Sequence, residues 1–272
     1  MNATKLAIPF LVALAYGPAQ GFAAPIFPED LASFAVLAAA GVTNVATSTI
    51  GGNLGSAPDP SVGGGYDFTF GSLQPNTALA QNAQIQLDAA ILAVNAFGPG
   101  LTLGADLTGT IFPGIYTVLA GVTNLSGALI LDGQGDSNAV WIFLFASTLI
   151  TSEDSTVTVL NVGDGAGVGL YWSVGSAATL DGDTFAGNVL AHDLISSNGD
   201  LTLACGRLLS AETQVTLIHD KISIGCEGVG FGSGGFDQVG GGRIVPEPAT
   251  LLLFGFGLAG LFTFRKRLFP VA

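Results

Sequence analysis

The sequence has little charge, and least of all positive charge. Only 10% of its 272 residues are charged, and 20 Asp and Glu stand against 7 Lys and Arg. Four of those cations lie near the two ends of the chain, which leaves Arg207, Lys221 and Arg243 for everything between them. Proteins that bind nucleic acid neutralise its phosphates with Lys and Arg. This balance therefore excludes nucleic acid as a partner and suits an acidic exported protein.

Cysteine and histidine are equally scarce, with two of each. Their spacings form no zinc-binding pattern, so the sequence predicts no metal ion and no cofactor. Cys205 and Cys226 are an even pair, which predicts a single disulfide in an oxidising compartment.

Residues 1–24 predict a secretory signal peptide. Lys5 precedes an apolar run at 6–16, and small residues follow between Ala19 and Ala24. This order is typical of a signal peptide, and the apolar run is too short to span a bilayer. We therefore expect the remainder of the chain to be exported.

The C-terminal segment has three parts that predict sorting to the cell envelope. A Gly-rich linker at 228–244 cannot bury enough apolar surface to fold and should act as a tether. After it come Pro246, Glu247 and Pro248, an apolar run within 245–267, and the cations Arg265, Lys266 and Arg267. This order resembles the PEP-CTERM sorting signal of Gram-negative bacteria, which implies processing by an exosortase. The cations should stay on the cytoplasmic side, as they would in a plain single-pass membrane anchor.

Residues 25–227 are long enough for one domain with a sizeable core. Helical periodicity marks only the segment 76–97, where apolar residues recur at Leu79, Ala83, Leu87, Ala90, Ile91 and Val94. Asn76 is the expected N-cap, and Gly98 and Pro99 end the helix. A single apolar stripe predicts that this helix lies against a larger structure.

That larger structure is predicted to be mainly β. From 102 to 224, short runs of β-forming residues alternate with turn dipeptides such as Asp181-Gly182 and Asn198-Gly199. Five phrases repeat loosely, at 120–124, 147–151, 176–180, 192–196 and 213–217. A sustained repeat of this kind predicts a solenoid whose coils contribute short strands to stacked faces. A two-sheet sandwich is the alternative.

The phrase AGVTN occurs twice, at 40–44 and again at 120–124. Alternate residues of a strand point to opposite faces, so the third residue of each phrase, Val122 for example, should be buried and the fourth exposed. The fourth residue is threonine in four phrases, at Thr43, Thr123, Thr179 and Thr216. Stacked coils would repeat it about every 4.7–4.9 Å. Threonine is also favoured on any exposed strand, so such a column alone need bind nothing.

Several landmarks resemble the DUF3494 ice-binding proteins. They are SFAVL at 33–37, GGNLG at 51–55, PGIY at 113–116, VWIF at 140–143 and CGRLL at 205–209. The resemblance covers about 31–226 and includes several landmarks in the right order. It implies a discontinuous right-handed β-helix of triangular section, with one long α-helix packed alongside.

Active members of that family bind ice through a flat β-face with the motif Thr, Ala or Gly, any residue, Thr or Asn. Carried over, the motif implies a surface for ice or ordered water made by Thr43, Thr123, Thr148, Ser176, Thr179, Thr213 and Thr216. Ile150 and Ile195 depart from it, because each stands where Thr or Asn is expected. Gln214 is too long, and Asp193 would bring a hydrated charge into the middle of the face.

Two other classes of function compete with ice binding. Polysaccharide lyases and hydrolases also use β-helices, but they need clustered carboxylates or a base beside cations. Turn chemistry explains the pairs Asp181 with Asp183, Glu153 with Asp154, and His192 with Asp193, and the loop 132–138 lacks EF-hand spacing. No enzyme is therefore predicted. The other alternative is a cell-surface or matrix protein that contacts extracellular polysaccharide and has lost ice binding.

Overall fold

The computed structural model describes residues 26–163, 165 and 167–225. These residues form two helices, α1 (Glu29–Ala32) and α2 (Ala78–Asn95), and a continuous system of parallel strands. The strands are β1 (Phe34–Ala38), β2 (Val42–Gly51), β3 (Asn53–Ser56), β4 (Val62–Phe70), β5 (Leu73–Pro75), β6 (Leu101–Leu103), β7 (Gly109–Ile111), β8 (Gly114–Val118), β9 (Ala128–Asp132), β10 (Val140–Phe145), β11 (Leu149–Ile150), β12 (Thr156–Leu160), β13 (Gly169–Val174), β14 (Ala178–Leu180), β15 (Thr184–Ala191), β16 (Ile195–Ser197), β17 (Thr202–Ser210), β18 (Val215–Ile218) and β19 (Lys221–Ser223).

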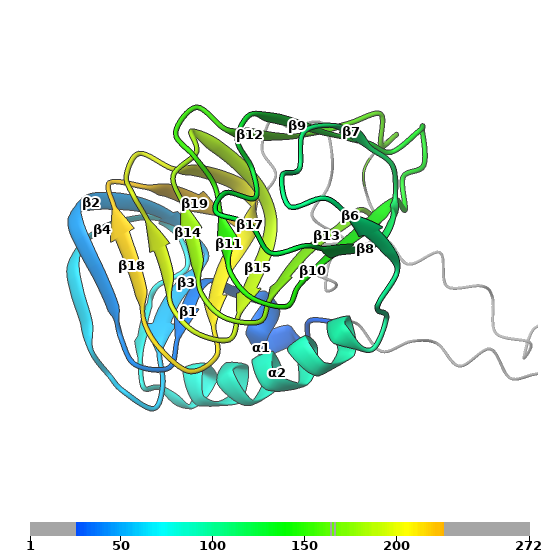
Figure 1. Ribbon diagram of the computed structural model, residues 1–272. Helices are drawn as coiled ribbons and strands as arrows, with labels where there is room; N and C mark the ends of the chain where they lie inside the picture. Colours follow the sequence, from blue (N-terminus) through cyan, green and yellow to red (C-terminus); the bar gives the residue numbers. More distant parts are fainter. Residues whose placement is uncertain (1–25, 164, 166, 226–272) are drawn as a thin grey trace, which may run out of the picture.

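The strands stack into three sheets around one axis, as Figure 1 shows. Sheet 1 contains β6, β8, β10, β13, β15, β17, β1, β3 and β5 in spatial order. Sheet 2 contains β11, β14, β16, β18, β2 and β4. Sheet 3 contains β7, β9, β12, β15, β17, β19, β2 and β4. Since strands of successive coils pair in parallel, the predicted β-helix is confirmed, and the sandwich alternative is wrong.

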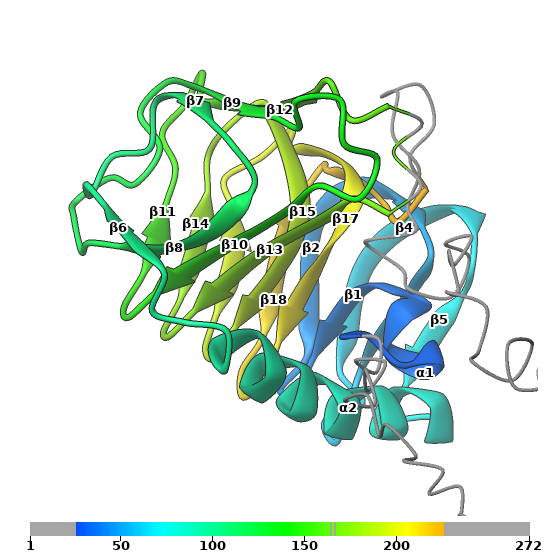
Figure 2. The same cartoon turned by 90° about the vertical axis from the view of Figure 1, so that its right-hand side faces the viewer.

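The order of the coils in space differs from their order in the chain. After β5 the chain runs through α2 along the whole stack and begins again at β6, at the opposite end (Figure 2). It then winds back until β17 pairs with β1, where Leu208 lies opposite Val36, and β18 pairs with β2. The last coil therefore fits beside the first, which is the discontinuity that the family resemblance implied.

Helix α2 is shorter than the predicted 76–97, and its N-cap is Thr77 rather than Asn76. The Thr77 hydroxyl accepts a hydrogen bond from the backbone N–H of Ala80 at 3.3 Å. Asn76 has a φ of 48°, so it belongs to the turn before the cap. The buried stripe of α2 is Ala80, Ala83, Leu87, Ala90 and Val94. The predicted Leu79 and Ile91 are only partly buried and pack at the edge of this stripe.

Two cores hold these layers together. Inside the coils, aromatic rings stack from one coil to the next: Phe143 lies 5.5 Å from Tyr116 and 4.4 Å from Trp172 between ring centroids. The second core lies between sheet 1 and the two helices. The fully buried strand β1 contributes Phe34 and Leu37 to it and its other side chains to the core inside the coils. Each fully buried apolar side chain contributes about 1.5–3 kcal/mol. The helix thus covers one sheet and leaves sheets 2 and 3 open to solvent.

Arg207 is completely buried in this second core. Its guanidinium donates to the carbonyl oxygen of Ala32 at 2.7 Å and to Asn188 Oδ1 at 2.9 Å, and it lies 5.4 Å from the centre of the Phe27 ring. A buried guanidinium requires such partners, because an uncompensated charge costs several kcal/mol. Arg207 therefore anchors α1 to sheet 1 and is not available to an external ligand.

Several sequence predictions concern residues outside the described ones. They are the signal peptide at 1–24, the linker at 228–244, the sorting segment at 245–267 and Cys226. Cys205 is buried, and no cysteine within the described residues is free. The disulfide between Cys205 and Cys226 remains a prediction. In the described part of the chain, no helix is both long and apolar enough to cross a membrane.

Candidate functional site

Sheet 2 carries the predicted threonine phrases, and its pairing register aligns them across five coils. Thr43 lies opposite Thr216, Thr216 opposite Ser196, Ser196 opposite Thr179, and Thr179 opposite Ile150. We call these five outward residues the threonine column. The hydroxyls of neighbouring coils meet: Thr43 Oγ1 donates to Thr216 Oγ1 at 3.2 Å, and Ser196 Oγ donates to Thr179 Oγ1 at 3.5 Å.

The residue that precedes each member of the threonine column is buried, and it fixes the position of that member on the surface. Val42, Val215, Ile195, Ala178 and Leu149 pair across the same five strands and are fully buried. A close-packed interior of this kind resists deformation. The column is therefore held in line by the core of the β-helix, and strand spacing sets its repeat at about 4.7–4.9 Å.

The phrase at 192–196 is shifted by one residue from the predicted alignment. Ile195 pairs with Val215 and is buried, whereas Ser196 pairs with Thr216 and points outward. The expectation that Ile195 interrupts the face is therefore wrong. The turn dipeptides could have predicted this alignment. Ser196 precedes the turn glycine Gly199 by the same number of residues as Thr179 precedes Gly182.

A second outward column runs beside the first, two residues earlier in each strand. It consists of Gln214, Leu194, Ala177 and Thr148, whereas Gly41, the corresponding residue before β2, is buried. Neither column contains a charged residue. Gln214 is exposed and is the longest polar side chain on this surface. The two columns together form a narrow uncharged surface of small, hydroxylated and aliphatic side chains.

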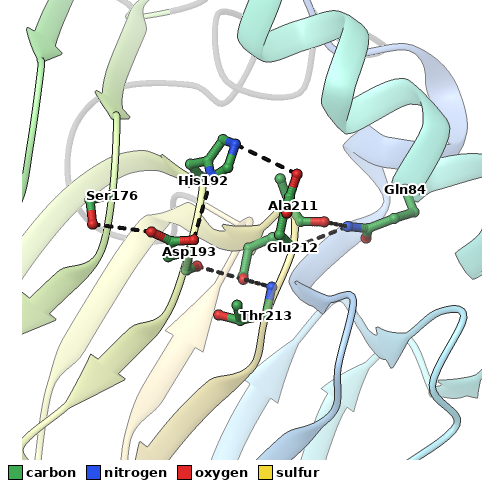
Figure 3. Close-up of polar contacts among 8 residues, drawn as sticks. Gln84, Ser176, His192, Asp193, Ala211, Glu212 and Thr213 are labelled. Atoms are coloured by element: carbon green, nitrogen blue, oxygen red, sulfur yellow. Dashed lines mark hydrogen bonds and ion pairs between the residues drawn. The ribbon is translucent and has the colours of Figure 1, made fainter.

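Asp193 lies at the corner where sheet 2 begins, so the expectation of a charge in mid-face is wrong. Figure 3 shows its carboxylate held by neighbours on both sides. Ser176 Oγ donates to Asp193 Oδ2 at 3.1 Å, and His192 Nδ1 lies 3.3 Å from Asp193 Oδ1. His192 Nε2 in turn lies 3.6 Å from Glu212 Oε1. Polar residues of three successive coils thus meet at this corner.

Ser176 and Thr213 occupy the same corner position as Asp193 in their own coils. The backbone N–H of Thr213 is hydrogen-bonded to Ser210 Oγ at 3.3 Å. From α2, Gln84 Nε2 donates to the carbonyl oxygen of Ala211 at 2.7 Å (Figure 3). Ser176 and Thr213 therefore border the two outward columns. They lie at the corner where sheet 2 meets the segment that contacts α2.

The second copy of AGVTN takes a different position from the first. Val42 is fully buried, whereas Val122 is 94% exposed in a loop, so the prediction that Val122 points inward is wrong. Asn124 is buried in its place: its Nδ2 donates to the Ala105 carbonyl at 3.1 Å, and its Oδ1 accepts from the N–H of Ile150. Thr123 is half-buried beside it and does not extend the threonine column.

The chemistry of this surface is that of hydroxyl and methyl groups. Across the described residues, no group of three or more His, Cys, Asp or Glu side chains could hold a metal ion. Two hollows in the described part are lined by residues of 132–135 and 159–163 and by residues of sheet 3, and neither is lined by the threonine column. An uncharged surface of this kind can contact an ordered lattice of water through its hydroxyl and methyl groups.

Comparison with known proteins identifies the family. The family model described as Ice-binding-like matches residues 36–223, and that of the PEP-CTERM protein-sorting motif matches 245–267. The sorting motif supports the expected export. An ice-binding protein of Nostoc sp. (strain HG1) is 34% identical over 241 residues, which cover 86% of this chain and 85% of that protein. An ice-binding protein of Colwellia sp is 28% identical, with coverage of 82% and 93%.

Solved structures agree with the sequence comparison. The ice-binding protein of the Antarctic ascomycete Antarctomyces psychrotrophicus has a TM-score of 0.61 and 30% identity, over 72% of this chain and 96% of that one. An ice-binding protein from an Antarctic biological consortium has a TM-score of 0.65 and 27% identity, with coverage of 80% and 96%. On the family model and the relative from Nostoc together, the chain belongs to the Ice-binding-like family.

Proposed function

We propose that this protein binds ice through the threonine column of sheet 2 and its neighbouring column. The observation that carries the proposal is the register that aligns Thr43, Thr216, Ser196 and Thr179 on consecutive coils, with a fully buried residue beneath each. Relatives in sequence and in fold are named ice-binding proteins, which supports the proposal.

The surface suits ice because ice presents ordered water and no charge. Each threonine offers a hydroxyl that can take the place of a lattice water and a methyl group that contributes apolar area. The rigid core keeps these groups in line, so little conformational entropy is lost on adsorption. Ile150 extends the apolar part of the column, whereas the exposed Gln214 retains its own hydration. We therefore expect modest activity.

The function would be exercised outside the cytoplasm and would involve no catalysis. The sorting motif at 245–267 supports export in a Gram-negative bacterium and processing by an exosortase. In this proposal the apolar segment lies in the inner membrane, either until an exosortase cleaves it or permanently. Extracellular polysaccharide is the partner in the alternative function, a matrix protein that has lost ice binding. Gln214 favours that alternative, because it interrupts the flat surface.

The test is inhibition of ice recrystallisation by the purified protein. Thr179→Tyr and Thr216→Tyr should each abolish inhibition, because a bulky ring lifts a flat surface from the lattice. Thr184→Tyr, on the exposed sheet 3, is the matched control and should retain activity. If the unmodified protein leaves crystal growth unchanged at high concentration, ice binding is wrong, and the matrix-protein function replaces it.

A further inference from the structure

Sheet 3 carries a second line of outward residues, on a different face from the threonine column. In register across its strands lie Thr156, Thr184, Thr202, Lys221, Thr49 and Asp67. This face is hollowed. A depression of about 280 Å³ is lined by Thr49, Gly51, Thr69, Phe70, Ala204, Lys221, Ser223 and their strand neighbours.

Small residues create the hollow. Ala204, Ser223 and Gly51 lie opposite one another, two residues further along their strands than Thr202, Lys221 and Thr49. They give the depression a low floor. A Cβ atom at Gly51 would lie 2.5 Å from Ser223 Oγ and 3.0 Å from Phe70 Cε1. A side chain at Gly51 would therefore press on Ser223 and on the ring of Phe70, a residue that lines the hollow and is 48% exposed.

Lys221 also lines the hollow, and its strand β19 lies two strands from β4, which carries Phe70. With Arg207 buried, Lys221 supplies the one exposed Lys or Arg side chain within the described residues. Ion pairs in the described part all involve histidine, and none includes Lys221. Its ammonium group therefore has donors available to a ligand, between the hydroxyls of Thr202 and Thr49 on the adjacent strands.

We propose that this hollow binds a carboxylate-bearing sugar unit of an acidic polysaccharide. The ammonium group of Lys221 would donate charge-assisted hydrogen bonds to the carboxylate. Thr49 and Thr202 would meet sugar hydroxyls, and the Phe70 ring would cover an apolar face of the pyranose. The inference does not depend on ice binding, because sheet 3 and sheet 2 are separate faces of the β-helix.

The acidic balance of the protein limits the affinity but leaves the site intact. Asp67 is the nearest acid in the same line and lies two strands from Lys221, about 9–10 Å away. At physiological ionic strength the Debye length is about 8 Å, so more distant acids are largely screened. The contact with Lys221 therefore makes the largest electrostatic contribution to binding. Repulsion by the surrounding acids should restrict binding to one short stretch of the polymer.

The probe is trigalacturonate, titrated into the isotope-labelled protein at physiological salt and followed by NMR. We expect a saturable shift of the amide signals of Thr49, Thr202 and Ser223. Lys221→Gln should weaken binding at least about tenfold, as expected for a lost charge-assisted hydrogen bond, and Lys221→Arg should retain it. Thr216→Tyr, on sheet 2, should leave binding unchanged and thereby separates this site from the ice surface.

Three results would overturn the proposal. One is equal binding of trigalacturonate by the unmodified protein and by Lys221→Gln, or no binding to either. Another is equally tight binding of neutral maltotriose or of inorganic sulfate, which would mean that no carboxylated sugar is selected. The third is a zero-length cross-link, in the protein alone, between Lys221 and a carboxylate beyond residue 225. That link would mean that the protein's own tail occupies the hollow.

Discussion

Ser196 lies directly opposite Thr216 where β16 pairs with β18, and its neighbour Ile195 lies opposite Val215. One residue of register thus decides whether this coil adds a hydroxyl or a buried aliphatic group to the column. Because the side-chain period of a strand is two, a one-residue shift moves every side chain to the other face. The continuity of the candidate ice surface rests on this pairing.

Ser196→Thr should strengthen ice binding. The change adds the methyl group that the neighbouring threonines already have, and one methyl brought into contact is worth about 0.8 kcal/mol, so roughly fourfold less protein should suffice. Ice-recrystallisation inhibition over a dilution series measures this. Ile195→Thr is the matched control: it buries a hydroxyl and should lower the free energy of unfolding by about 2–3 kcal/mol without a gain in activity. A gain with Ile195→Thr would contradict the register.

The two copies of AGVTN make a second matched pair. Val42→Ala removes buried methyl groups and should lower the free energy of unfolding by about 2 kcal/mol. Val122→Ala changes a side chain that is 94% exposed and should lower it by less than about 0.5 kcal/mol. Urea denaturation of the two variants under one condition gives the comparison. Equal losses would mean that both copies occupy core positions after all.

Asp220 should make the native state relatively more stable in acid. Burial raises the pKa of Asp220, although hydrogen bonds from Ser197 Oγ and from the N–H groups of Ile218 and Leu201 oppose this shift. Since its folded-state pKa lies above the unfolded value, the stability it contributes is present below the unfolded pKa. That contribution is lost as the pH rises through the folded pKa.

The measurement is the difference in free energy of unfolding between the unmodified protein and Asp220→Asn, from about pH 3.5 upward, where the ordinary Asp pKa lies near 3.9. The advantage of Asp220 over asparagine should shrink as the pH rises. Asp88→Asn, which removes an exposed carboxylate on α2, controls for the loss of one charge. A difference that grows with pH would show that the hydrogen bonds outweigh burial.

Cys205 and Cys226 should form a disulfide in the exported protein. Non-reducing mass spectrometry should find no free thiol, and peptides containing the two cysteines should be joined. The double variant Cys205→Ser, Cys226→Ser should lower the free energy of unfolding by about 3 kcal/mol, the value expected for a short closed loop. Two alkylatable thiols in the protein isolated from an oxidising compartment would refute the pairing.

The sequence by itself determined the class of fold and the single long helix, and it predicted three of the threonines that the candidate site aligns. These follow from local patterns: a helical stripe at 76–97, recurring β-phrases between turns, and family landmarks from 33 to 209. Hydrophobic periodicity is a property of neighbouring residues, so it can be read without knowing their distant contacts. The same reasoning found Thr43, Thr179 and Thr216, which the structure brings onto one column.

Only the tertiary structure decided register, corner positions and the meeting of distant segments. Identical phrases gave a buried Val42 and an exposed Val122, because pairing with neighbouring coils, rather than local sequence, selects the inward side chain. The structure moved Asp193 from the face to a corner for the same reason. The hollow beside Lys221 joins β2, β4, β17 and β19, which meet because the last coil packs beside the first. That long-range pairing depends on the packing of the whole β-helix.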